Sequence, residues 1–297
     1  MQQQSKATLY ALATVFIWST VASAFKLSLQ FLQVTQLLFF SSLTSVLVLL
    51  ALVAMQGQLG FFKSLGWREW GFSLLLGLFN PFAYYLVLFK AYDLLPAQEA
   101  QPLNYTWAIT LSLLSVPLLK QRIKAWDLLA LIISYLGVFV IGVRGEVASL
   151  ELSNPLGVGL ALFSTLIWAL YWIFNTRDPM APTRRLFLNF LFGTLFSGLT
   201  LVCVGNWHLP PLKGLLGAAY VGFFEMGITF VLWSTALKLS RTALQVSIFI
   251  YLSPFLSLVF IHVFVGEAIL PSTIMGLLLI MTGIGLQQFS AIRRNPV

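Results

Sequence analysis

Two polar side chains lie deep inside apolar stretches of the sequence, and their types could do chemistry there. Asn80 lies within the apolar run of residues 70–91, beside Pro81, and Glu225 lies within the run of residues 213–236. An amide or a carboxyl group facing hydrocarbon is costly, so both are expected to face the protein interior or a water-filled path. A carboxyl group there either binds a substrate amine or a proton, or is neutral and hydrogen-bonded to a neighbouring helix. The sequence leaves both interpretations open.

Asn80 and Glu225 occupy equivalent positions in an internal repeat. At an offset of 145 residues, Gly77 matches Gly222 and Asn80 matches Glu225. Residues three and four positions apart share one face of a helix, so Gly77, Asn80 and Tyr84 are predicted to lie on one face. Tyr84 is therefore predicted to line the same site as Asn80.

Five aromatic side chains inside apolar stretches complete the candidate site. Tyr105 matches Tyr251 at an offset of 146 residues, and Trp18 matches Trp168 at an offset of 150 residues. Trp107 lies two residues after Tyr105 and either lines a cavity or belongs to an interfacial belt, where Trp and Tyr are enriched. The tyrosines either serve the site or pack with their hydroxyls bonded to another helix.

The composition indicates that lipid covers much of this chain. Of its 297 residues, 59% are hydrophobic and only 9% are charged, and the mean hydropathy is +0.91. Soluble domains carry about 25% charged residues. A water-soluble fold could not bury this much apolar surface, so the elements that position the candidate residues are expected to be membrane-spanning helices.

The predicted fold class is an all-α membrane protein with ten transmembrane helices. A spanning helix needs about 20 mostly apolar residues. Breaking the sequence at its charged and Pro/Gly-rich points gives ten spans, near residues 8–28, 35–55, 70–91, 98–119, 126–143, 155–175, 184–205, 213–236, 242–264 and 272–290. They form one integral membrane domain, in which residues 1–146 are the first five-helix repeat and residues 147–297 are the second. Because five is odd, the second repeat is expected to be inverted.

The positive charges predict the orientation. With the N-terminus inside the cell, 13 of the 17 Lys and Arg residues fall on the cytoplasmic side. The other side holds four, which are Lys26, Lys90, Arg144 and Lys213. By the positive-inside rule, this asymmetry predicts that both termini are cytoplasmic. It also explains the net charge of +8 without nucleic acid.

The residues expected of several other protein classes are missing. The single Cys203 excludes an intramolecular disulfide, and the two His residues lie far apart in the sequence, so no metal site or other cofactor is expected. The sequence has no G-x-x-x-x-G-K-[ST], H-E-x-x-H or G-x-S-x-G pattern, which argues against ATP hydrolysis and against an enzyme.

Three segments resemble the drug/metabolite transporter superfamily of the EamA type. They are IWSTVASAFK (17–26), FKAYDLLPAQEAQPLNYTWA (89–108) and SPFLSLVFIHVFVGEAILPSTIMGLLLIMTGIGL (253–286). Within the superfamily, LNYTWA is similar to the L-N-Y-L-W-P stretch of YddG-type amino acid exporters, with Ala108 in place of the proline.

This resemblance implies a ten-helix inner-membrane carrier with both termini cytoplasmic. It also implies a central cavity lined by helices 1, 3, 4, 6, 8 and 9. The positions of this sequence that match those helices, and that are predicted to bind substrate, are Trp18, Asn80, Tyr84, Tyr105, Trp107, Trp168, Glu225 and Tyr251.

The predicted function is that of a secondary transporter that exports amino acids and related small metabolites by alternating access. Its partners are then a small-molecule substrate and the lipid bilayer, without nucleic acid. The alternative is a proton-coupled multidrug or lipophilic-cation exporter, in which Glu225 exchanges protons for cations. A membrane enzyme or a non-transporting sensor is a more distant alternative.

Overall fold

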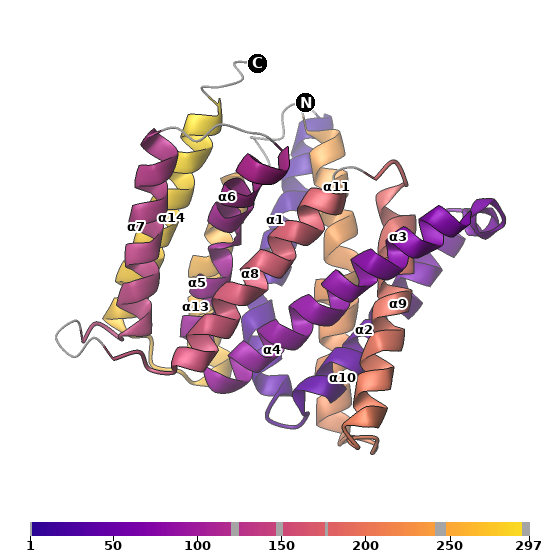
Figure 1. Ribbon diagram of the computed structural model, residues 1–297, viewed down its shortest axis with the longest axis horizontal. Helices are drawn as coiled ribbons and strands as arrows, with labels where there is room; N and C mark the ends of the chain where they lie inside the picture. Colours follow the sequence, from indigo (N-terminus) through magenta and orange to yellow (C-terminus); the bar gives the residue numbers. More distant parts are fainter. Residues whose placement is uncertain (1, 120–124, 147–150, 176–177, 241–247, 293–297) are drawn as a thin grey trace. The chain divides into compact units, whose positions relative to one another are not determined.

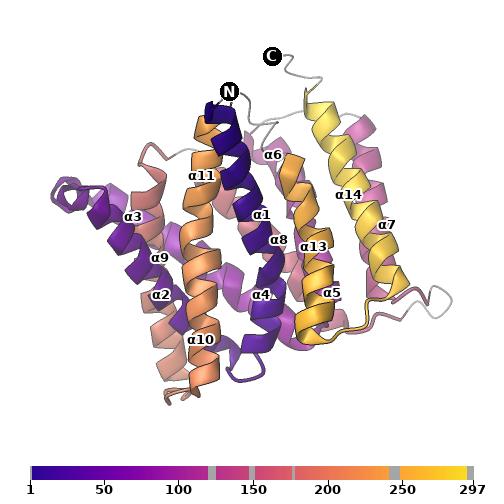
Figure 2. The ribbon, with the colours of Figure 1, turned by 180° about the vertical axis from the view of Figure 1, so that it is seen from behind.

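The computed structural model describes residues 2–119, 125–146, 151–175, 178–240 and 248–292 (Figures 1 and 2). Within these ranges every regular element is a helix, as the composition predicts. In hydrocarbon a backbone N–H or C=O group finds no water, and a helix satisfies these groups within one segment. The first six residues of the predicted ninth span, 242–247, lie outside the described residues.

Six helices in the described part of the chain are long and apolar enough to cross a membrane. They comprise residues Gln3–Ser28, Val34–Met55, Trp67–Leu94, Pro155–Asn175, Pro182–Cys203 and Leu212–Leu239. Three shorter apolar helices comprise residues Leu128–Gly142, Phe249–Val265 and Pro271–Gln287. The prediction of ten spanning helices with both termini inside stays a prediction.

The chain forms two compact units. The first consists of Met1–Phe89 and Asp178–Val265, and the second of Lys90–Arg177 and Gly266–Val297. Each unit takes helices from both halves of the chain, so neither coincides with one of the predicted five-helix repeats. The division at residue 146 therefore stays a prediction.

The first unit is built around long helices from both halves of the chain. α2 packs against α9, and α1 packs against both α11 and α13. Its helices are α1 (Gln2–Ser28), α2 (Val34–Met55), η1 (Leu59–Ser64), α3 (Trp67–Gly77), η2 (Leu78–Ala83), the start of α4 (Tyr84–Leu94), α9 (Pro182–Cys203), α10 (Leu212–Tyr220), η3 (Val221–Ile228), α11 (Thr229–Leu239), η4 (Ile248–Leu252), α13 (Ser253–Phe260) and η5 (Ile261–Val265).

Two glycines let helices of the first unit cross at close range. A Cβ atom on Gly77 in α3 would lie 2.5 Å from the backbone oxygen of Asn189 in α9. A Cβ atom on Gly222 in η3 would collide with the backbone oxygen of Ser41 in α2. Small residues at such crossings allow two backbones to approach in a membrane. The two crossings involve the glycines that match at an offset of 145 residues.

A π-helical segment interrupts each of the two helical runs that carry Asn80 and Glu225. The segment η2 (Leu78–Ala83) contains Asn80 in an extended conformation, with φ −141° and ψ 120°, followed by Pro81. The segment η3 (Val221–Ile228) contains Glu225. The helix is kinked beside Pro81, because proline lacks the N–H group that a continuous helix would use. Single π turns inside α-helices occur frequently at functional sites.

The second unit consists of α5 (Ala97–Tyr105), α6 (Trp107–Leu119), α7 (Ala125–Gly142), α8 (Pro155–Asn175) and α14 (Pro271–Ile292), with the end of α4. α7 and α14 lie side by side (Figures 1 and 2). The predicted span 98–119 is two helices, not one. Pro102 lies inside α5, and the helix is interrupted at Thr106. The Thr106 hydroxyl donates a hydrogen bond to the backbone oxygen of Leu103 at 2.7 Å.

A partly buried polar network holds the start of α5. The Glu267 carboxylate accepts hydrogen bonds from the backbone N–H groups of Ala97 at 2.7 Å and Gln98 at 3.0 Å. The side chain of Glu99 is 1% exposed and is bonded by Arg144 Nε at 2.6 Å and by the Ser153 hydroxyl at 2.8 Å. These residues are far apart in the sequence. The network therefore joins the start of α5 to segments that lie next to the ends of other helices in the second unit.

Candidate functional site

The Glu225 carboxyl group is the centre of a polar cluster in the first unit. The Tyr85 hydroxyl donates a hydrogen bond to Glu225 Oε1 at 3.1 Å. The Trp18 side chain also interacts with this carboxyl group. Glu225 Oε2 is shielded from solvent and has no partner of hydrogen-bond geometry among the described residues. One oxygen of this buried carboxyl group thus lacks a hydrogen bond among the described residues.

Further aromatic rings pack against the two side chains that contact this carboxyl group, Trp18 and Tyr85. The Trp18 ring lies 5.6 Å from the Trp233 ring, centroid to centroid, at an angle of 49°. The Tyr84 and Tyr85 rings are 4.8 Å apart and meet edge to face. The structure thus brings three predicted residues, Trp18, Tyr84 and Glu225, into one group that is linked through Tyr85.

Tyr85 was missed by the sequence analysis because the helix is not continuous. In an uninterrupted α-helix Asn80 and Tyr84 share a face, and Tyr85 points about 100° away from Tyr84. The π segment η2 and the extended backbone of Asn80 change this phase, so the Tyr85 hydroxyl is the one that reaches Glu225. The signal in the sequence was Pro81, which indicates that the helix is interrupted between Asn80 and the two tyrosines.

Asn80 and Tyr251 each carry a buried polar group without a partner. Asn80 is fully buried, and neither its amide nitrogen nor its amide oxygen has a hydrogen-bond partner in the part of the chain that the structure describes. The same is true of the Tyr251 hydroxyl on η4. Buried polar side chains in folded proteins normally make hydrogen bonds, so each exception needs an explanation. A bound polar ligand is one explanation.

The remaining predicted residues belong to the second unit. Tyr105 is the last residue of α5, Trp107 is the first residue of α6, and both are half-buried. Trp168 on α8 is half-buried and stacks on Tyr171, with ring centroids 5.9 Å apart. Its ring also meets the Trp172 ring edge to face at 5.8 Å. The three rings therefore form an aromatic cluster on α8.

The eight predicted residues are divided between the units, five in the first and three in the second. In the first are Trp18, Asn80, Tyr84, Glu225 and Tyr251. In the second are Tyr105, Trp107 and Trp168. The prediction of a common cavity lined by all eight stays a prediction.

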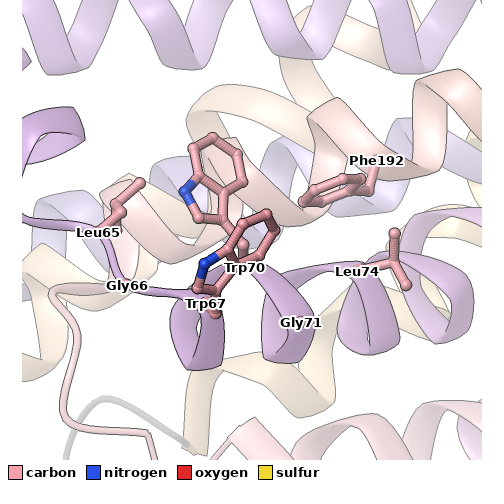
Figure 3. A pocket seen from close by; sticks show the side chains of 7 residues that line it. All are labelled: Leu65, Gly66, Trp67, Trp70, Gly71, Leu74 and Phe192. Atoms are coloured by element: carbon pink, nitrogen blue, oxygen red, sulfur yellow. The ribbon is translucent and has the colours of Figure 1, made fainter.

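A separate aromatic pocket lies at the start of α3 (Figure 3). It has a volume of about 630 Å³ and is lined by Leu65, Gly66, Trp67, Trp70, Gly71, Leu74 and Phe192. The side chain of Trp67 is 92% exposed, and the Trp70 ring meets the Phe192 ring edge to face at 5.9 Å. None of the eight predicted site residues lines this pocket. Exposed Trp at the end of an apolar helix is typical of the membrane–water interface.

Helices of this length and hydropathy, with polar groups buried inside two of them, define a multi-pass membrane protein. The chain belongs to the EamA-like transporter family, whose family model matches residues 5–143 and 155–287. The family expected from the three sequence segments is therefore confirmed. The chain is accordingly a transporter.

Named relatives are distant. The aromatic amino acid exporter YddG of Ancylobacter novellus is 24% identical over 267 residues, covering 86% of this chain and 87% of the relative. The uncharacterized transporter YvbV of Bacillus subtilis is 25% identical, covering 73% and 71%. An uncharacterized transporter of Clostridium kluyveri is 24% identical, and the match spans 55% of its length. A crystal structure with 23% identity has the same fold, with a TM-score of 0.69 over 98% of this chain and 99% of that chain.

Proposed function

We propose that this protein is a secondary transporter that exports amino acids and related small metabolites across the inner membrane by alternating access. The observation that carries the proposal is the set of buried polar atoms without partners on Asn80, Glu225 and Tyr251. A zwitterionic ligand carries both the donors and the acceptors that these atoms lack. Ionisable residues inside spanning segments commonly mark a substrate or ion pathway.

The substrate class follows from the chemistry around Glu225. A carboxylate oxygen without a partner attracts an ammonium group, and indole rings such as those of Trp18 and Trp233 are the side chains that best provide cation–π attraction. The aromatic rings also provide an apolar wall for a substrate side chain. The 24% identical relative is named an aromatic amino acid exporter, which supports this substrate class.

The same proposal includes ten spanning helices, two inverted repeats over residues 1–146 and 147–297, and both termini in the cytoplasm. The two matches to the family model support the duplication. So do the helical runs Trp67–Leu94 and Leu212–Leu239, which are both 28 residues long and lie 145 residues apart. Inverted repeats let a transporter present one site to either side of the membrane in turn.

Counterflow of radiolabelled amino acids into proteoliposomes tests the substrate class. Because a hydrogen bond to a charged group contributes about 1.5–3 kcal/mol, Glu225→Gln is expected to lower uptake about 10-fold or more. Tyr105→Phe and Trp168→Ala are expected to lower it at unchanged expression. Glu151→Gln, on an exposed connection, is the matched control and keeps the wild-type rate. Wild-type rates in all three site variants would refute the site.

A proton-coupled multidrug or lipophilic-cation exporter is the second candidate. The observation in its favour is that Glu225 Oε2 is shielded from solvent and lacks a hydrogen-bond partner among the described residues, which also suits a proton carrier. Export of a lipophilic cation is then expected to respond to an imposed pH gradient in the wild type and not in Glu225→Gln. Amino acid counterflow without any response to the gradient excludes this candidate.

A further inference from the structure

A second groove in the first unit has a chemistry that the proposed transport does not use. It has a volume of about 460 Å³ and lies over α1, with α10 on one side and α13 with η5 on the other; Figure 2 shows α10 and α13 on opposite sides of α1. Most of its lining is apolar, including Phe16, Leu27, Phe260 and Phe264.

One end of the groove is cationic. Lys213, in the first turn of α10, lies with its Nζ 5.8 Å from the centre of the Phe31 ring, and both residues line the groove. Lys213 is exposed, and the ion pairs among the described residues do not include it. The first backbone N–H groups of α10 have no partners within the helix and add positive potential here. An anionic group is therefore favoured at this end.

This cationic end lies where two apolar helices end. α1 ends at Ser28 and α10 begins at Leu212. From Ser28 to Phe16 the groove follows α1 for roughly 18 Å, at about 1.5 Å per residue. One leaflet of the hydrocarbon core is about 15 Å thick. The groove therefore runs from the membrane surface through the depth of a leaflet.

The wall of the groove contains an unsatisfied hydroxyl. Ser23 Oγ is buried and has no hydrogen-bond partner among the described residues. By contrast, the nearby Ser28 hydroxyl donates to the backbone oxygen of Ala24 at 2.6 Å, and Thr20 and Tyr220 share a hydrogen bond of 2.6 Å. Ser23 lies between the cationic end and the aromatic end. It is in place to donate to an acceptor on a ligand that is otherwise apolar.

We propose that this groove binds an anionic phospholipid. The phosphate lies at Lys213 and the start of α10, an ester oxygen accepts a hydrogen bond from the Ser23 hydroxyl, and one acyl chain lies along α1 and ends against the rings of Phe16 and Phe260. These two rings already meet edge to face at 5.5 Å and form the far end of the groove. The site is independent of the substrate proposed above.

Photo-crosslinking in vesicles tests this site. The full-length protein is reconstituted in phosphatidylcholine vesicles that contain a trace of phosphatidylglycerol with a diazirine on one acyl chain. A parallel preparation contains phosphatidylcholine with the same chain. Labelled peptides are mapped by mass spectrometry. The anionic probe is expected to label residues 16–31 and 213–220 about fivefold more than the zwitterionic probe, since one Lys near an anionic lipid contributes about 1 kcal/mol.

Two variants and one control decide the outcome. Lys213→Gln is expected to reduce labelling by the anionic probe to the level of the zwitterionic probe. Lys63→Gln, which removes an exposed lysine outside the groove, keeps the preference. Ala24→Phe fills the groove and is expected to abolish labelling by both probes. Equal labelling by the two head groups, labelling outside the groove, or a preference that survives Lys213→Gln would overturn the proposal.

Discussion

At the scale of single residues, the two carboxyl oxygens of Glu225 differ in their hydrogen bonds. Tyr85 bonds Oε1, while Oε2 stays without a hydrogen-bond partner among the described residues. Tyr85 thus orients the group through one oxygen, and the other oxygen is the one that we propose binds the substrate. The ring of Tyr85 is fully buried, so its hydroxyl is held in a fixed position.

We predict that Tyr85→Phe lowers counterflow of amino acids about 10-fold, because the Glu225 carboxyl loses the donor that orients it, and such a bond contributes about 1.5–3 kcal/mol. The measurement is initial uptake in proteoliposomes at equal protein content. Tyr135→Phe, on an exposed position of α7, is the control and is expected to keep the wild-type rate. Equal rates in Tyr85→Phe and wild type would contradict the orienting role.

At the scale of elements, close crossings hold helices of the first unit together, and a cap from a distant segment holds a helix of the second unit. Gly77 and Gly222 each lie where a second helix leaves no room for a Cβ atom. The start of α5 is capped by Glu267, which lies 170 residues away in the sequence from Ala97. Both contacts lie close to predicted site residues. Gly77 is three residues before Asn80, and the capped helix α5 ends at Tyr105.

Two glycines of α3 are expected to respond in opposite directions to alanine. Gly77→Ala is predicted to lower the melting temperature of the purified protein, because overpacking costs about 1–3 kcal/mol. Gly71→Ala is predicted to keep or raise it, since nothing lies within 4 Å of a Cβ there and alanine stabilises a helix interior by about 0.5–1 kcal/mol. Equal shifts in the two variants would show that the crossing is not tight.

Removing the cap of α5 is expected to loosen the start of this helix. Glu267→Ala leaves the N–H groups of Ala97 and Gln98 without their acceptor, at a cost of about 0.5–2 kcal/mol. Hydrogen exchange of the peptide that contains these amides should become faster, while exchange in α9 should not change. Uniform acceleration across both helices would indicate global destabilisation and would argue against a local cap.

At the scale of the whole molecule, the distribution of positive charge and the internal repeat predict how the chain lies in the membrane. Thirteen of 17 Lys and Arg residues fall on one side if the N-terminus is cytoplasmic. In that orientation α9 runs outward from Pro182, and its last residue, Cys203, lies at the outer surface. The single cysteine of the sequence is exposed and so reports on the topology directly.

We predict that a membrane-impermeant maleimide labels Cys203 in intact cells. The reciprocal variant carries Lys63→Cys in a Cys203→Ser background, and it should be labelled only after the cells are permeabilised, because Lys63 lies in a predicted cytoplasmic connection. The reverse pattern, with Lys63→Cys labelled from outside, would invert the predicted orientation.

Properties that depend on composition and local pattern could be predicted from the sequence. The apolar composition identified a membrane protein built from helices, and three segments identified the family that the family model confirms. Each of these properties depends on residue types within one segment, because every spanning helix must satisfy its own backbone in lipid.

The partners of individual side chains were decided by the tertiary structure. The π segment η2 changes the phase of the helix, so Tyr85, which the periodic pattern did not place on the face of Asn80, bonds Glu225. The predicted span 98–119 is interrupted at Thr106. Glu99 is buried, and its carboxylate accepts hydrogen bonds from Arg144 and Ser153, which belong to distant segments. A periodic pattern describes one regular helix. It contains no information about where that helix is interrupted or which remote segment lies against it, and those two factors determine the partners of a buried polar group.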